Sequence, residues 1–186
     1  MRSKTEIRRE LLAARRALGP AELQLAAERL VAVAARAPLL VEARTVASYA
    51  AVAPEPETGL LTRWFEERRV RVLLPVLHDD NDLGWGETGA GLVPGRFGLS
   101  EPAVDLGVDA VRGVDVVLCP ALAVDRDGVR LGRGGGSYDR ALARVPVVVA
   151  VVAVVYDSEV VESLPKDAHD QRVSHVLTPG GLIGLG

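Results

Sequence analysis

The sequence predicts an α/β fold, a three-layer sandwich with a largely parallel central sheet and an amino-terminal helix pair. Apolar residues recur at helical spacing through residues 4–35, and apolar strand candidates alternate with helical segments after residue 44. Residues 145–156 form an apolar run that is typical of a strand buried on both faces, as parallel sheets require. Because 186 residues are enough for one core of native size, we expect a single domain over residues 1–186.

The first two helices are predicted from their start and stop signals. Ser3 and Glu6 have the spacing of a capping box, ahead of a helix that runs to about Ala17. Gly19 supplies a stop, and the next residue, Pro20, suits the first turn of a second helix that ends near Ala35.

The middle of the chain alternates between the two kinds of element. We predict a strand at 45–49, a helix at 58–68 and a strand at 70–74 that Pro75 ends. Residues 84–113 are rich in glycine and proline but not of low complexity, which indicates a long ordered excursion rather than a linker. The predicted elements of the last third are a strand at 115–119, a turn at 125–128, a helix from about Gly136, and strands near 147–155 and 173–177.

Composition excludes several classes of function. The formal net charge is -3 and the basic residues are dispersed, so the chain lacks the basic face of a nucleic-acid-binding protein. The charged start has no signal core, and the most apolar stretch contains a proline and is shorter than the ~18 residues of a membrane span. The one cysteine, Cys119, lies in an apolar run, where a thiol usually acts as a small buried hydrophobe. We therefore expect a cytoplasmic protein with no nucleic-acid or membrane partner, as a monomer or weak homodimer.

The segment 130–142 carries the strongest chemical signal. It has four glycines in five positions, whose backbone amides can converge on a polyphosphate ahead of a helix start. Arg130 and Arg133 offer charge-assisted bonds to phosphate oxygens, and Asp139, in the first helical turn, is placed to hold a phosphate-bound magnesium ion.

Three known motifs do not fit this segment. A Walker loop needs a lysine before its serine, a dinucleotide fingerprint needs glycine at Ser137, and a nucleophile elbow needs glycine at Asp139. A tight turn whose serine caps a helix remains the structural alternative.

Residues 130–140 resemble the signature of the 5-formyltetrahydrofolate cyclo-ligase family at nearly every position. Further matching segments follow in the family's order: Lys4-x-x-x-Arg8, 55–58, 74–76, 95–102, 115–120, 164–165 and 169–170. The resemblance implies ATP-dependent cyclisation of 5-formyltetrahydrofolate to 5,10-methenyltetrahydrofolate, with ADP and phosphate released and Mg2+ required. A divergent paralogue that phosphorylates another small molecule, or a nucleotide- or folate-binding protein without turnover, stays open.

The resemblance also implies roles for individual residues. It assigns ATP binding to Lys4, Arg8, Arg130, Gly132, Arg133, Gly134, Gly135, Gly136, Ser137 and Tyr138. It assigns folate contacts to Ala50, Glu55, Phe97, Ser137 and Glu159, metal binding to Asp139 and Asp170, and catalysis to Arg133 and Asp139. Considered singly, Lys4 and Arg8 fit a solvated helix face, Glu55 a surface loop and Phe97 a core position.

Two residues depart from the family pattern. Ser137 stands where the family has the first tyrosine of Tyr-Tyr-Asp, and Glu159 stands where a glutamine is common. We expect both to face the folate and to weaken its binding relative to typical members.

Overall fold

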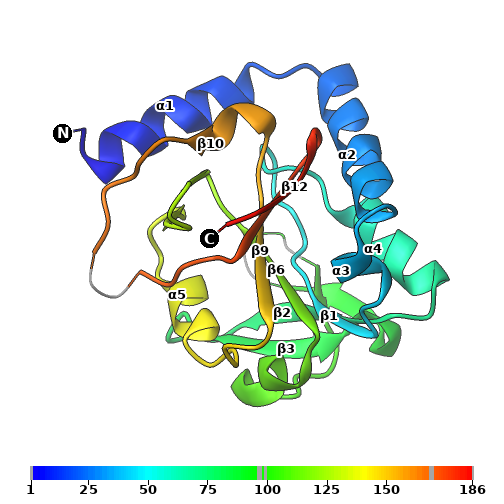
Figure 1. Ribbon diagram of the computed structural model, residues 1–186. Coiled ribbons are helices and arrows are strands. Elements are labelled where there is room, and N and C mark those ends of the chain that lie inside the picture. The colour runs from blue at the N-terminus through cyan, green and yellow to red at the C-terminus, as the bar shows by residue number, and fades with distance from the viewer. Residues whose placement is uncertain (1, 96–97, 99, 168–169, 186) are drawn as a thin grey trace.

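The computed structural model describes residues 2–95, 98, 100–167 and 170–185, and its centre is a seven-stranded sheet (Figure 1). The strands are, in spatial order, β12 (Gly181–Gly184), β11 (His175–Thr178), β9 (Ala150–Val154), β6 (Val116–Pro120), β1 (Thr45–Ala47), β2 (Arg71–Leu77) and β3 (Leu83–Glu87). Neighbours from β11 to β2 are parallel, and the edge strands β12 and β3 are antiparallel. The predicted largely parallel sheet is confirmed.

Five α-helices are described: α1 (Lys4–Arg16), α2 (Pro20–Ala34), α3 (Pro38–Val41), α4 (Gly59–Glu67) and α5 (Ser137–Leu142). Short 3-10 turns occupy Thr88–Ala90, Val108–Gly113 and Asp157–Glu159. The predicted capping box of α1 is present, because the Ser3 hydroxyl accepts from the Glu6 amide and the Ser3 amide donates to the Glu6 carboxylate at 2.8 Å.

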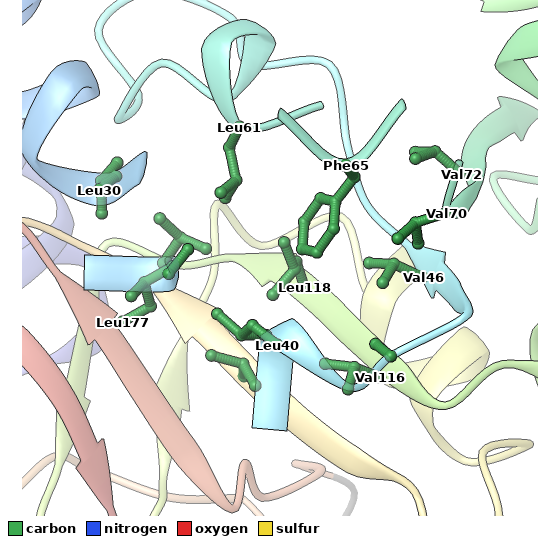
Figure 2. Packing of buried hydrophobic residues seen from close by; sticks show 14 of the residues in the cluster. Leu30, Leu40, Val46, Leu61, Phe65, Val70, Val72, Val116, Leu118 and Leu177 are labelled. Atoms are coloured by element: carbon green, nitrogen blue, oxygen red, sulfur yellow. The ribbon is translucent and has the colours of Figure 1, made fainter. Parts of the chain in front are cut away.

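The helices cover both faces of the sheet, which confirms the three-layer prediction. On one face, Leu30 of α2 and Phe65 of α4 pack against strand residues such as Leu118 (Figure 2). On the other face, α5 contributes Ala141 and Leu142 to a cluster that includes Trp85 and Val117. These side chains are buried, so the two clusters remove most of the sheet's apolar surface from water.

The predicted amino-terminal helices are present, but they cover different parts of the fold. The described part of the chain contains a second, three-stranded sheet of β7 (Ala123–Asp125), β8 (Arg130–Leu131) and β10 (Val160–Val161). Ile7 and Leu11 of α1 pack on the cluster centred on this sheet, whereas α2 packs on the large sheet beside α4 (Figure 1). As a result α1 lies near the glycine-rich segment that follows β8.

Strand β2 does not end before Pro75, as the sequence predicted, but continues to Leu77. Its pairing with β1 stops at Leu73, so Pro75 faces no neighbour on that side and pairs only with Trp85 of the antiparallel edge strand. A proline is tolerated there because no ladder bond needs its missing N–H.

The glycine-rich excursion at 84–113 is ordered, as predicted, but it contains strands that the pattern did not reveal. Its start belongs to β3, and β4 (Leu92–Pro94) and β5 (Ser100–Pro102) form an antiparallel pair. The backbone carbonyl of Val104 lies 2.1 Å from where a Cβ on Gly86 would stand, so the glycine content reflects close packing rather than looseness.

The apolar run at 145–156 is a buried strand only in part. Residues from Val152 to Val155 are fully buried, whereas Val147 and Val148 precede β9 and are exposed. Cys119 is buried as expected, and burial raises the pKa of its thiol to about 11. Within the described residues, no helix combines the length and the apolar character needed to cross a membrane.

Candidate functional site

The main cavity, of about 330 Å³, lies at the carboxyl ends of neighbouring parallel strands. Tyr49 and Ala50 follow β1, Pro120 ends β6 and Ala121 follows it, and all four line the cavity. The chain runs from β1 to β2 on one side of the sheet, whereas β6, β9 and β11 lie on the other side. Ligands of open α/β sheets bind where the strand order reverses in this way.

The glycine-rich loop forms one wall of this cavity, and α1 contacts this loop. Gly132 and residues 134–136 line the cavity, and Arg8 Nε donates to the Gly132 carbonyl at 2.9 Å. Gly134 has a φ of 102°, and a Cβ there would lie 3.5 Å from the Arg8 guanidinium carbon. Arg8 and the loop, which are far apart in sequence, are therefore in contact.

The helix after the loop has only six residues, which limits any helix-dipole contribution. Its amino-terminal cap is Gly136 in the left-handed conformation, with φ 72° and no side-chain capping bond. Ser137 is thus the first residue of the helix and lines the cavity, and it does not cap the helix as the structural alternative supposed.

Alanine at Gly134 is expected to raise the KM for ATP, the nucleotide that the family resemblance implies, about tenfold. An L-residue at this φ costs roughly 1 to 3 kcal/mol, which the loop relieves by moving its amides out of their converging arrangement. Steady-state kinetics with varied ATP measures the effect. Gly107 is the matched control, since it has a φ of 89° and a Cβ added there would meet only open space, away from the cavity. Gly107→Ala should lower stability without changing the KM for ATP, and equal effects of the two variants on KM would contradict a phosphate-binding loop.

Arg130 is a buried cation behind the loop. Its side chain is 3% exposed, its Nη2 donates to Asp139 Oδ1 at 2.7 Å, and its Nη1 donates to the Pro120 carbonyl at 3.2 Å. Its Nε has no hydrogen-bond partner among the described residues. Arg130 is therefore fixed in place, where it orients Asp139 and contributes positive charge to the cavity wall.

Arg133 and Glu55 connect the glycine loop to the loop that follows β1. Arg133 Nε lies 3.1 Å from Glu55 Oε1, and the Glu55 carboxylate also accepts from the Val52 amide at 2.9 Å. Glu55 lines the cavity, but two protein donors already engage its carboxylate. Arg133 is about half exposed and so remains available to an anion in the cavity.

Two tyrosine hydroxyls of the cavity wall have no hydrogen-bond partner among the described residues. Tyr49 and Tyr138 are cavity-lining residues whose buried hydroxyls form no hydrogen bond within the described part of the chain. Burial raises the pKa of both phenols well above the ordinary value, so both stay neutral at physiological pH. Unpaired buried hydroxyls are costly, so the wall is suited to a ligand with polar groups. Tyr49 was not predicted as a site residue, because its position just after a strand has no distinctive sequence pattern.

The two expected metal ligands occupy different cavities. Asp139 lines the main cavity, whereas Asp170 lines a second cavity with Asp167 and Lys166. Asp170 Oδ2 accepts from Lys4 Nζ at 2.6 Å and from the Asp167 amide at 2.7 Å. No group of three metal-ligating side chains occurs among the residues that the structure describes.

Lys4 is held at this second cavity. Burial alone would lower the pKa of its ammonium group, but the hydrogen bonds that this group donates to the Asp167 and Asp170 carboxylates outweigh burial and raise the pKa. Lys4 and Arg8 therefore project from one helix to different neighbours: Lys4 to these carboxylates and Arg8 to the glycine loop.

The structure does not bring Glu159 to the main cavity, where we expected it to face the folate. Glu159 does not line the cavity and is 3% exposed. It forms a buried ion pair with Arg15, whose Nε lies 2.7 Å from Glu159 Oε1. Ser137 and Ala50, by contrast, do line the cavity, and Phe97 lies outside the described residues.

Comparison with known proteins gives a consistent result. The family model described as "5-formyltetrahydrofolate cyclo-ligase family" matches residues 1–179. The chain is 41% identical to a 5-formyltetrahydrofolate cyclo-ligase of Mycolicibacterium smegmatis, with 99% of this chain and 98% of the relative covered. It is 33% identical to the Escherichia coli enzyme of the same name over 89% of this chain and 94% of that protein. The solved structure of Aquifex aeolicus 5,10-methenyltetrahydrofolate synthetase superposes with a TM-score of 0.85 at 30% identity, covering 98% of this chain and 92% of that one.

Proposed function

The chain belongs to the 5-formyltetrahydrofolate cyclo-ligase family, and we propose that its main cavity converts 5-formyltetrahydrofolate and ATP to 5,10-methenyltetrahydrofolate, ADP and phosphate. The observation that carries the proposal is the contact of Arg8 with a glycine loop that shares its cavity with Arg133 and Asp139. This arrangement supplies backbone amides, cations and a carboxylate to one polyphosphate.

The chemistry proceeds in two displacements. The formyl oxygen attacks the γ-phosphorus of ATP, and the bond from this phosphorus to the β,γ-bridging oxygen breaks. ADP departs, and the substrate is now an imidate phosphate. The para-aminobenzoyl nitrogen of the same substrate then attacks the activated carbon, the carbon–oxygen bond breaks, and the inorganic phosphate leaves with the proton that this nitrogen loses. Both nucleophiles belong to the substrate, so the protein has to align them and neutralise phosphate charge.

This division of labour fits the side chains of the cavity. Cys119 is buried with a raised pKa, so its thiolate does not compete as a nucleophile. Arg133, half exposed at the loop, is the cation that we assign to the transferred phosphate. We assign the remaining loop residues, Gly132 to Tyr138, to ATP binding.

Mg2+ would supply charge neutralisation on the phosphates, and Asp139 fits that ion. Its carboxylate lines the cavity, is 22% exposed and is oriented through Oδ1 by Arg130. Asp170 would have to release Lys4 to reach the same ion, since Lys4 holds its Oδ2. We therefore assign the ion to Asp139, and Asp170 would join it only after Lys4 releases that carboxylate.

We further propose a single domain in the cytoplasm, as a monomer or weak homodimer. A family match over residues 1–179 supports one domain, and a single buried cysteine suits a reducing compartment.

The test is an assay of the purified protein with 5-formyltetrahydrofolate, ATP and magnesium. The near-ultraviolet band of the methenyl product should appear, with one ADP and one phosphate formed per product molecule, and a chelator should abolish turnover. Product formed without nucleotide, or at full rate in chelator, would contradict the mechanism. ATP consumption without methenyl product would favour a different phosphate acceptor.

A further inference from the structure

Two arginines tie α5 to the turn between β2 and β3, residues 78–82. Arg144, which follows α5, donates from Nη1 and Nη2 to the two carboxylate oxygens of Asp82, at 2.9 and 2.5 Å. Arg140, one helical turn earlier, donates from Nη2 to the Asn81 carbonyl at 2.6 Å. The Arg144 and Asp82 side chains are 24% and 12% exposed. A bidentate pair that is shielded from water in this way fixes the position of one element relative to the other.

The turn that receives these arginines is held by hydrogen bonds of its own. The Asp82 amide donates to Asp80 Oδ1 at 2.9 Å, and the His78 amide donates to the Asp82 carbonyl at 3.0 Å. The hydrogen bonds from Arg144 lower the pKa of the Asp82 carboxyl, so this carboxylate is ionised at physiological pH and balances the guanidinium charge. The turn is therefore a fixed point against which α5 can be held.

Helix α5 is too short to fix its own direction. It has six residues, and the loop before it contains Gly134 and Gly136 with φ of 102° and 72°. A helix of this length has few internal hydrogen bonds, and glycines restrict the preceding chain little. The direction of α5 therefore depends on the burial of Ala141 and Leu142, which share a cluster with Trp85 of β3, and on the two arginines.

The two elements that the arginines join both carry residues of the main cavity. Helix α5 contributes Ser137, Tyr138 and Asp139, which we assign to the nucleotide and its metal ion. The strands that flank the turn contribute Leu77, at the end of β2, and Leu83, at the start of β3. The contact between α5 and the turn thus sets where the Asp139 carboxylate lies relative to the apolar part of the cavity.

Alignment is the main demand of the proposed reaction, because the formyl oxygen has to meet the γ-phosphorus in line. A displacement of about 1 Å can lower the rate of such a step about 100-fold. We propose that Asp82 is a positioning residue for this reaction: through Arg144 it holds α5, and with it Asp139, in place beside the apolar part of the cavity. Neither Asp82 nor Arg144 lines the cavity, so both act through α5. The inference rests on the proposed function, because it concerns the same cavity and the same reaction.

The first test is Asp82→Asn, which keeps the shape but turns one acceptor toward Arg144 into a donor. We expect kcat for methenyl formation to fall about tenfold at saturating substrates and magnesium. The Kd for ATP and the Kd for 5-formyltetrahydrofolate, each measured alone by calorimetry, should change less than about threefold, because each ligand still meets its own part of the cavity. The double variant Asp82→Asn with Arg144→Gln leaves no charge unbalanced, and its kcat should fall no further than that of Asp82→Asn.

Tryptophan fluorescence reports on α5 directly. Trp85 is fully buried, and the chain has one other tryptophan, Trp64. In a Trp64→Phe background, acrylamide quenching of Trp85 should increase roughly twofold when Asp82→Asn is added, because α5 covers the indole less tightly. The double variant with Arg144→Gln should show the same increase, since both changes break the same contact.

Two controls separate positioning from a general effect on the fold. Glu87→Gln breaks an exposed ion pair with Arg71 that joins β2 and β3 at the other end of the same hairpin, and it should leave kcat and quenching unchanged. Val33→Ala removes buried side-chain volume from α2, on the other face of the sheet. It should lower the melting temperature without changing kcat or the quenching of Trp85.

An unchanged kcat in Asp82→Asn would overturn the inference, as would a lower kcat without increased quenching, because the effect would then not act through α5. An equal fall of kcat in Val33→Ala would also overturn it, since general loss of stability would explain the result. So would a double variant whose loss is the product of the two single losses. Failure of the proposed function is a different result, in which the wild type itself forms no methenyl product, while quenching still shows whether the ion pair holds α5.

Discussion

Replacement of Asp139 by Asn is expected to lower kcat by at least ~100-fold, with the fold retained. The amide has nearly the same shape as the carboxylate, and its oxygen can still accept from Arg130, which lies 2.7 Å from Oδ1 in the native protein. The change removes one negative charge that would balance the divalent ion on the phosphates. The measurement is the rate of methenyl formation at saturating ATP, folate and magnesium, beside a thermal unfolding curve.

The matched control is Asp109→Asn. Asp109 also lies in the first turn of a short helical segment, but it is exposed and pairs with Arg112 away from the cavity. It should keep normal turnover. If Asp139→Asn also kept near-normal turnover at saturating magnesium, Asp139 would be a helix-start acid with a structural role only.

Local signals in the sequence were sufficient to predict the amino-terminal helices and the parallel sheet. The capping box at Ser3 and the proline at position 20 predicted both amino-terminal helices to within about one residue. The alternation of strands and helices predicted the parallel sheet, because parallel neighbours need crossover helices. The partners of each helix were not predictable in this way, and α1 proved to pack on the small sheet rather than beside α2.

The missed elements depend on tertiary packing. Strand β3 carries glycines at 84 and 86, which weaken a strand pattern, yet both are needed because neighbouring atoms lie within 2.3 Å of where a Cβ on either residue would stand. Pro75 predicted a strand end, but β1 ends earlier and leaves the position unpaired on one side. Whether a residue has a neighbouring strand on each side depends on the lengths of all the strands in the sheet, which local sequence does not show.

The residues of the candidate site divide in the same way, into those that a local sequence motif indicates and those that only the fold brings together. The glycine loop, Arg133 and Asp139 are adjacent in sequence, so their pattern is visible, and the structure places them together in one cavity. Tyr49 reaches the same cavity from another element, and its place in the lining and its buried hydroxyl, which has no partner among the described residues, identify it. Glu159 shows the opposite case: the motif placed it at the folate, whereas the structure buries it against Arg15.

The last prediction follows from that ion pair: Glu159→Gln should lower the free energy of unfolding by about 3 to 5 kcal/mol. The Arg15 and Glu159 side chains are only 1% and 4% exposed, and Glu159 also accepts from the Tyr156 amide at 2.8 Å. Glutamine cannot balance the Arg15 charge, which would remain buried, and Arg15 Nη1 already lacks a partner among the described residues. Denaturant unfolding of the two proteins measures the difference.

Two comparisons make this prediction specific to burial. Glu162, three residues further on, pairs with Arg126 at the surface with 81% of its side chain exposed, so Glu162→Gln should change stability by less than about 1 kcal/mol. The double change Arg15→Met with Glu159→Leu should lower the free energy of unfolding by less than the sum of its single changes, because no uncompensated charge stays buried.

Arg15 also donates to the carbonyl of the cavity residue Ala121, at 2.6 Å, so the pair joins α1 to the cavity wall. Glu159→Gln should therefore not improve the KM for folate, as a direct contact with that substrate would have required; a stable variant with a lower KM would show that Glu159 does act on the substrate.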